Sequence, residues 1–124
     1  MDDRSQLDAL MRDRELLEAA AKAAGIDAEF HPELGFGSEG MWLKGDRSPD
    51  NSKYWNPLNC DGDALRLAVK LRLHINIEPY GAAARRQRMD WHGCESHLHG
   101  GLEAATRRAI VRAAAAIRAM QEGE

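Results

Sequence analysis

The chain has 124 residues, of which 44% are hydrophobic and 30% are charged, and its formal net charge is −3. These values are ordinary for a globular protein, and they exclude a disordered tail, a collagen-like repeat and a disulfide scaffold. The acidic balance also excludes a general nucleic-acid coat, because phosphate binding needs an excess of Lys and Arg. We expect one domain over residues 1–124, within which residues 1–12 form an additional N-terminal helical segment.

We expect no targeting segment in this sequence. No run of 18 apolar residues is present, and the first residues are polar and acidic, unlike those of a signal peptide. The chain has two cysteines, Cys60 and Cys94, which in this setting indicate reduced thiols. We therefore expect a cytoplasmic protein that makes no contact with a membrane.

Charge is distributed unevenly along the chain. Residues 1–62 carry 13 acidic and 7 basic side chains, whereas residues 63–124 carry 7 acidic and 10 basic ones. The net charges of the two halves are thus −6 and +3. This asymmetry indicates either a basic binding face or two oppositely charged surfaces that keep a small protein soluble.

The first predicted elements are a helix and a hairpin. Apolar residues recur at helical spacing from Ser5 to Ala24, with a break near Arg12, and Gly25 is the expected left-handed stop. Residues 28–44 predict a hairpin, since two short apolar segments flank several glycines. Residues 46–59 then form a long loop that is rich in turn residues, and loops of this length are often functional.

A second helix is predicted to begin with Asp61 or Asp63 as its N-cap and to end near Leu73. Its apolar residues cover roughly 200° of the helical wheel, which predicts burial on more than one side. The alternation over residues 74–78 predicts a half-buried strand, and a further strand is expected over residues 87–92, continuing toward His99.

The last predicted helix runs from Leu102 to Met120, with an apolar stripe opposite its arginines. The element order is therefore α-β-β-α-β-β-α. This order predicts the α+β class, with a small antiparallel or mixed sheet packed against helices.

Residues 54–71 carry a resemblance to a known family. An aromatic residue and a proline (Trp55 and Pro57) precede an acidic turn and an apolar helix, and similar alanine-rich segments occur at residues 20–26 and 104–110. In these features the chain resembles small phage and prophage proteins of the phage ABA-sandwich domain family. The resemblance implies a phage origin in a bacterial host and an ABA-sandwich-like architecture, but it implies no chemistry.

The first candidate site is the loop and turn that lead into the second helix, formed by Trp55, Asn56, Asp61 and Asp63. An aromatic ring beside an amide and two carboxylates can bind a ligand. The alternative is structural, because an Asp at this position caps the helix and Trp55 can cover the core with its large apolar area.

The second candidate is a group of metal ligands, namely His92, Cys94, His97 and His99. Imidazole and thiolate are good zinc ligands, although this spacing matches none of the usual zinc signatures. The same residues can instead line the solvent-facing side of a hairpin. A nucleophilic pair of Cys94 with a neighbouring histidine lacks an orienting acid.

The third candidate is basic and combines a predicted loop with the last helix: Arg85, Arg86, Arg88, Arg107, Arg108 and Arg112. Arginine suits bidentate contacts with phosphate, so the set can bind a phosphate-bearing ligand or an acidic protein surface. The alternative is a solvated helix face.

Together these features predict a non-enzymatic phage accessory protein that binds a host protein complex. Inhibition of a bacterial defence system, as by an anti-CRISPR protein acting on an effector complex, fits the size, the resemblance and the split charge. The alternatives are a sponge for a nucleotide defence signal, a zinc-binding module, and a virion or assembly protein. The alanine-rich last helix can also supply the seam of a homodimer.

Overall fold

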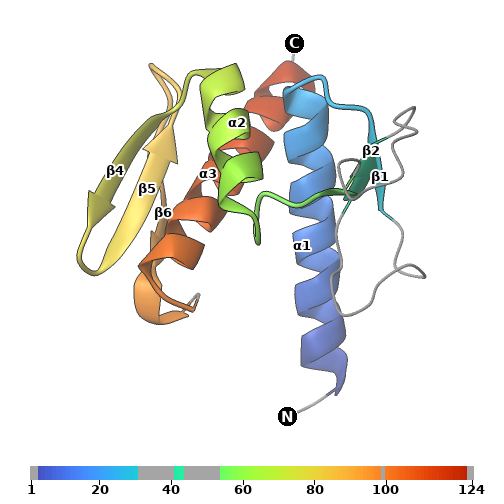
Figure 1. The fold of residues 1–124 in the computed structure, drawn as a ribbon, viewed down its shortest axis with the longest axis horizontal. Coiled ribbons are helices and arrows are strands. Elements are labelled where there is room, and N and C mark those ends of the chain that lie inside the picture. The colour runs from blue at the N-terminus through green and yellow to red at the C-terminus, as the bar shows by residue number, and fades with distance from the viewer. Residues whose placement is uncertain (1–2, 31–40, 44–53, 99, 123–124) are drawn as a thin grey trace.

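The computed structural model describes residues 3–30, 41–43, 54–98 and 100–122, and its fold belongs to the α+β class (Figure 1). The elements in chain order are α1 (Asp3–Ala23), β1 (Ala28–Phe30), β2 (Met41–Leu43), β3 (Tyr54–Trp55), α2 (Asp61–Leu71), β4 (His74–Glu78), β5 (Gly81–Arg85), β6 (His92–Glu95), the short 3-10 helix η3 (Ser96–Leu98) and α3 (Leu102–Glu122).

The strands form two antiparallel sheets, one in the order β1-β2-β3 and the other in the order β4-β5-β6. The predicted order of helix, hairpin, helix, hairpin and helix is confirmed, and each hairpin gains a third strand. The added strand β3 lies inside the predicted loop over residues 46–59, so Tyr54 and Trp55 pair with β2. Residues 46–53 of that loop lie outside the described residues.

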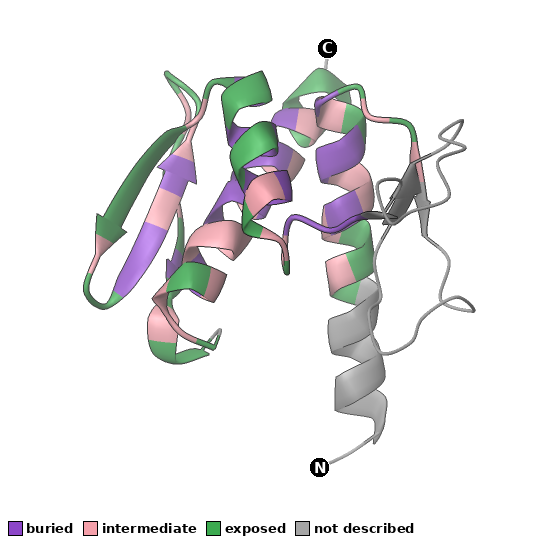
Figure 2. Ribbon diagram, in the orientation of Figure 1, coloured by how far each residue is buried: buried purple, intermediate pink, exposed green. Residues whose placement is uncertain are grey.

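Helix α3 lies at the centre of the fold and packs against α1, α2 and the sheet β4-β5-β6. Most of the buried apolar residues are alanines, such as Ala20 in α1, Ala84 in β5 and Ala113 in α3. Small side chains let the helix axes and the sheet approach closely, and alanine also has the highest helix propensity. Figure 2 shows the buried residues on the faces of α1, α2, α3 and β5 that turn toward one another.

The first helix is continuous from Asp3 to Ala23, so the predicted break near Arg12 does not occur, and residues 3–12 form the first turns of α1. Its end follows the sequence prediction. Gly25 has a φ of 69°, and the N–H of Ile26 donates to the carbonyl of Ala21 at 2.8 Å. This left-handed cap satisfies a carbonyl that the helix leaves without an internal partner.

Helix α2 differs from the prediction at both ends. Its N-cap is Cys60, which makes no side-chain capping bond, so neither Asp61 nor Asp63 is the cap. The helix ends at Leu71 instead of Leu73, because Arg72 adopts the left-handed conformation. Burial is also restricted to one face, since Leu67 and Leu71 are buried whereas Leu65 and Val69 are exposed.

The second sheet corrects two strand predictions. Residues 81–85 form the central strand β5, although the alanines there have low β propensity, while residues 87–91 form the connection to β6. Residues 96–98 form the short helix η3, so the strand does not continue from Glu95 toward His99 as predicted. Strand β4 forms as expected, yet four of its five residues are exposed, which contradicts the predicted half-burial.

Candidate binding groove

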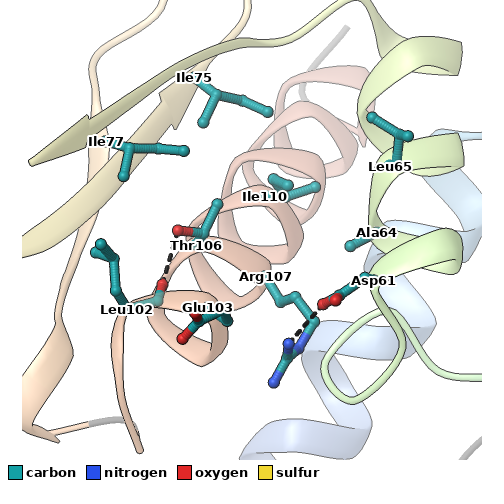
Figure 3. A pocket seen from close by; sticks show the side chains of 10 residues that line it. All are labelled: Asp61, Ala64, Leu65, Ile75, Ile77, Leu102, Glu103, Thr106, Arg107 and Ile110. Carbon is teal, nitrogen blue, oxygen red and sulfur yellow. Dashed lines mark hydrogen bonds and ion pairs between the residues drawn. The ribbon is translucent and has the colours of Figure 1, made fainter.

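An open groove of about 500 Å³ lies between α2, β4 and α3, with α3 as its floor (Figure 3). Figure 3 shows Ile75 and Ile77 extending from β4, Leu65 extending from α2, and Ile110 on the α3 floor. The complete lining is Asp61, Ala64, Leu65, Ile75, Ile77, Leu102, Glu103, Thr106, Arg107 and Ile110. The groove is therefore apolar along its length and carries charged groups from α2 and α3.

Large apolar side chains remain uncovered around this groove. Leu65 is 62% exposed and Ile77 is 56% exposed, and Val69 lies one turn after Leu65 on α2 with 67% of its surface accessible. Scattered single apolar residues are normal on a protein surface, whereas a contiguous set indicates an interaction site. The groove combines such a set with a concave shape.

The ion pair between Arg107 and Asp61 fixes α2 against α3 at the groove. Arg107 Nη1 donates to Asp61 Oδ1 at 2.6 Å, and Arg107 Nε donates to the carbonyl oxygen of Leu58 at 2.8 Å. The Arg107 side chain is 19% exposed and that of Asp61 is 80% exposed. Asp61 and the exposed Glu103 thus present carboxylates to solvent, while Arg107 holds the two helices together.

The other predicted residues of the first candidate site serve the structure. Trp55 is 5% exposed and belongs to the core, as its structural interpretation predicted. The backbone N–H of Asn56 donates to Asp63 Oδ2 at 2.9 Å, and Asn56 Oδ1 accepts the N–H of Leu58 at the same distance. These contacts join the loop to α2, and they leave Asp61 as the member of the set that lines the groove.

The predicted arginines of α3 contact the rest of the chain and do not form a solvated face. Arg108 makes a bidentate ion pair with Asp13 of α1, in which Nη1 donates to Oδ1 at 2.9 Å and Nη2 donates to Oδ2 at 3.2 Å. Arg112 donates to the carbonyl oxygen of Gly93 in β6 at 3.2 Å. Together with Arg107, these residues tie α3 to α1, to α2 and to the sheet.

The three arginines near the end of β5 lie in different surroundings. The guanidinium of Arg85 stacks over the ring of Trp91 at 4.5 Å, and its Nε is buried without a hydrogen-bond partner among the described residues. Arg86 Nε donates to the carbonyl oxygen of Leu71 at 3.3 Å. Arg88 is exposed in the connection between β5 and β6, where its φ is 72°.

The predicted metal ligands differ in burial. Cys94 is buried beneath α3, and His97 is exposed on η3, where its Nε2 lies 3.5 Å from Glu95 Oε2. No group of three His, Cys, Asp or Glu side chains suited to an ion occurs in the described ranges, and His99 lies outside them. His92 is partly buried on the same strand as Cys94.

Burial raises the pKa of the Cys94 thiol above its ordinary value, although Arg112 and Arg108 act in the opposite direction. The thiol therefore stays protonated at neutral pH, and only the thiolate is a good nucleophile or metal ligand. The geometry gives Cys94 the character of a small buried apolar residue.

Sequence reasoning did not identify the groove, although its signal is present in the sequence. The apolar arc of α2 is wider than one packed face, and β4 alternates apolar residues that the rest of the chain leaves exposed. An element whose apolar surface is wider than its packing neighbours can cover predicts such a site.

In the described residues, no helix is both long and apolar enough to cross a membrane.

Comparisons of the chain with protein-family models, with curated proteins and with solved structures found no match in any of the three.

Proposed function

We propose that this chain is a non-enzymatic accessory protein that acts by binding another protein, and that the groove between α2, β4 and α3 is its contact surface. The observation that carries the proposal is the exposure of Leu65 and Ile77 beside a concave apolar floor. Covering such a surface is favourable, because removing apolar area from water contributes a hydrophobic free energy of about 25 cal/mol per Å².

The chemistry of the groove favours a polypeptide as its occupant. Its charged groups lie at Asp61, Glu103 and Arg107, and Arg107 already binds Asp61 and the carbonyl oxygen of Leu58. The exposed carboxylates of Asp61 and Glu103 suit a partner that carries Lys or Arg next to apolar side chains. A phosphate-bearing ligand is a weaker candidate, because Arg107, Arg108 and Arg112 already contact carboxylates or carbonyls of this chain.

The biological setting of the proposal rests on the sequence resemblance to phage proteins. In that setting the partner is a protein complex of the bacterial host, and the role is inhibition of a defence system such as a CRISPR effector. The groove is the surface with which such an inhibitor would bind, and the resemblance to phage proteins is the reason for proposing a bacterial host protein as the partner.

A capture experiment with matched variants tests the proposal. The wild-type chain, Leu65→Glu and Met120→Glu are immobilised separately and exposed to the same bacterial lysate, and the retained proteins are quantified by mass spectrometry. Met120 is 57% exposed and lies at the C-terminal end of α3, outside the groove lining, so it is a matched apolar control. We expect a host protein retained by the wild type and by Met120→Glu but lost with Leu65→Glu. Equal retention by all three baits contradicts the proposal.

A further inference from the structure

Strand β4 ends the order of the sheet β4-β5-β6 in the part of the chain that the structure describes. Its sequence, from His74 to Glu78, contains no proline and no lysine, and it pairs with β5 in an uninterrupted register. Proteins commonly protect an exposed strand edge with such residues or with a bulge. No described strand pairs with the outer edge of β4, so this edge is available to a further strand.

The two faces of β4 differ in chemistry. Ile75 and Ile77 lie on the groove side, as Figure 3 shows, and they stand opposite Ala84 and Ala82 of β5. Since side chains alternate along a strand, His74, Asn76 and Glu78 share the other face. A strand added at this edge must match both the apolar and the polar face.

The sequence of β4 is complementary to itself in the antiparallel direction. When two copies pair about a two-fold axis at Asn76, Ile75 of each copy stands opposite Ile77 of the other. In the same register His74 stands opposite Glu78, which places a basic group against an acidic one. Cross-strand pairs of both kinds stabilise an antiparallel sheet.

We propose that a second copy of this chain pairs with the first through β4, about a two-fold axis at Asn76. The pairing joins the two sheets into one and adds Ile75 and Ile77 of each copy to the groove surface of the other. This inference rests on the proposed function, because it makes the dimer the form that presents the groove to the partner. An isologous two-fold contact of this kind is the commonest way in which soluble chains associate.

The alanine-rich stripe of α3 is a less suitable seam for a dimer. Ala105, Ala109 and Ala113 are fully buried inside the chain, so the stripe is already used. Met120, at the end of the predicted stripe, remains exposed. A substitution at Met120 therefore tests the helix seam separately from the β4 edge.

A charge-exchange experiment tests the β4 pairing. The molar mass of the wild type, His74→Glu and the double variant His74→Glu with Glu78→Lys is measured by light scattering across the micromolar range. His74→Glu places Glu against Glu78 twice per dimer, while Arg85 opposite residue 74 on β5 favours the new carboxylate within each monomer. The double variant places opposite charges in both pairs.

We expect the wild type to approach twice the chain mass of 13.8 kDa. His74→Glu should raise the dimer dissociation constant by a factor of about ten, and the double variant should recover most of that loss. Three outcomes overturn the inference: a wild type that stays monomeric, a double variant that fails to recover, or a dimer that Met120→Glu disrupts and His74→Glu does not. A monomer that still captures a host protein through Leu65 overturns the dimer alone and leaves the proposed function intact.

Discussion

The backbone N–H of Asn56 donates to Asp63 Oδ2 across 2.9 Å in the interior of the fold. Asn56 is 2% exposed and Asp63 is 7% exposed, so both groups are shielded from water. The other oxygen of the carboxylate accepts a hydrogen bond from Arg66 at 2.9 Å. Asp63 therefore anchors the segment after β3 to the first turn of α2, which forms one wall of the groove.

Substitution of Asp63 by alanine should destabilise the fold by about 1–3 kcal/mol, because it leaves the buried N–H of Asn56 without its acceptor. Asp63→Asn keeps an acceptor oxygen and should cost less. The free energy of unfolding in urea, measured for both variants, checks this expectation.

Arg66→Ala is the matched control for this contact. The Arg66 side chain is 74% exposed, so loss of its ion pair with Asp63 should change stability by no more than about 1 kcal/mol. If Arg66→Ala destabilises the protein as much as Asp63→Ala does, the buried bond to Asn56 is not the important contact.

Gly81 begins β5 at a place where another backbone approaches closely. A Cβ atom added there would overlap the carbonyl oxygen of Cys94 in the neighbouring strand, whereas a Cβ at Gly93 would meet only ordinary contacts, the nearest at 3.7 Å. Gly81→Ala should thus lower the free energy of unfolding by about 1–3 kcal/mol. Gly93→Ala should be neutral or stabilising by up to about 1 kcal/mol. Thermal unfolding of the two variants compares them, and equal losses would refute the close approach at Gly81.

The buried thiol of Cys94 should make stability depend on alkaline pH. Its pKa in the folded chain is raised above the ordinary value of 9.0, chiefly by burial. As pH rises past 9.0, the unfolded thiol loses its proton while the folded one keeps it, so the free energy of unfolding falls until the folded pKa is passed. Below the ordinary pKa this contribution is fully present.

Cys94→Ala should remove this part of the alkaline loss. The free energy of unfolding in urea is measured at neutral pH and at about pH 10 for the wild type and the variant. The difference between their losses of stability isolates Cys94 from other groups that titrate in this range. Cys60→Ala, at a partly exposed cysteine, is the control, and it should lose as much stability at alkaline pH as the wild type does. A Cys94→Ala variant that loses as much stability as the wild type would show that Cys94 is not the source.

The helices were predictable from the sequence because their signals are local. Apolar periodicity, the glycine after α1 and the alanine content of α3 all act within a few residues. The same local reasoning missed β5, because alanine disfavours strands on its own. Ala82 and Ala84 are buried, and their small side chains let the sheet pack closely on α3.

The roles of the charged residues depended on contacts that are distant in the sequence. Arg107 meets Asp61 across 46 positions, and Arg108 meets Asp13 across 95. No spacing rule within one helix reveals such partners, so the arginines were interpreted as a free basic set. The groove was missed for a related reason, since it exists only where α2, β4 and α3 come together.

The central claim, that the groove binds a protein, is tested most directly by photo-cross-linking from inside it. A photoreactive phenylalanine analogue replaces Leu65 in one variant and Met120 in another, and both are illuminated in the same bacterial cells. We expect position 65 to form a covalent adduct with a host protein and position 120 to form none with that protein. Adducts to that protein from position 120 but not from position 65, or no host adduct at position 65, would contradict the assignment of the groove as the binding surface.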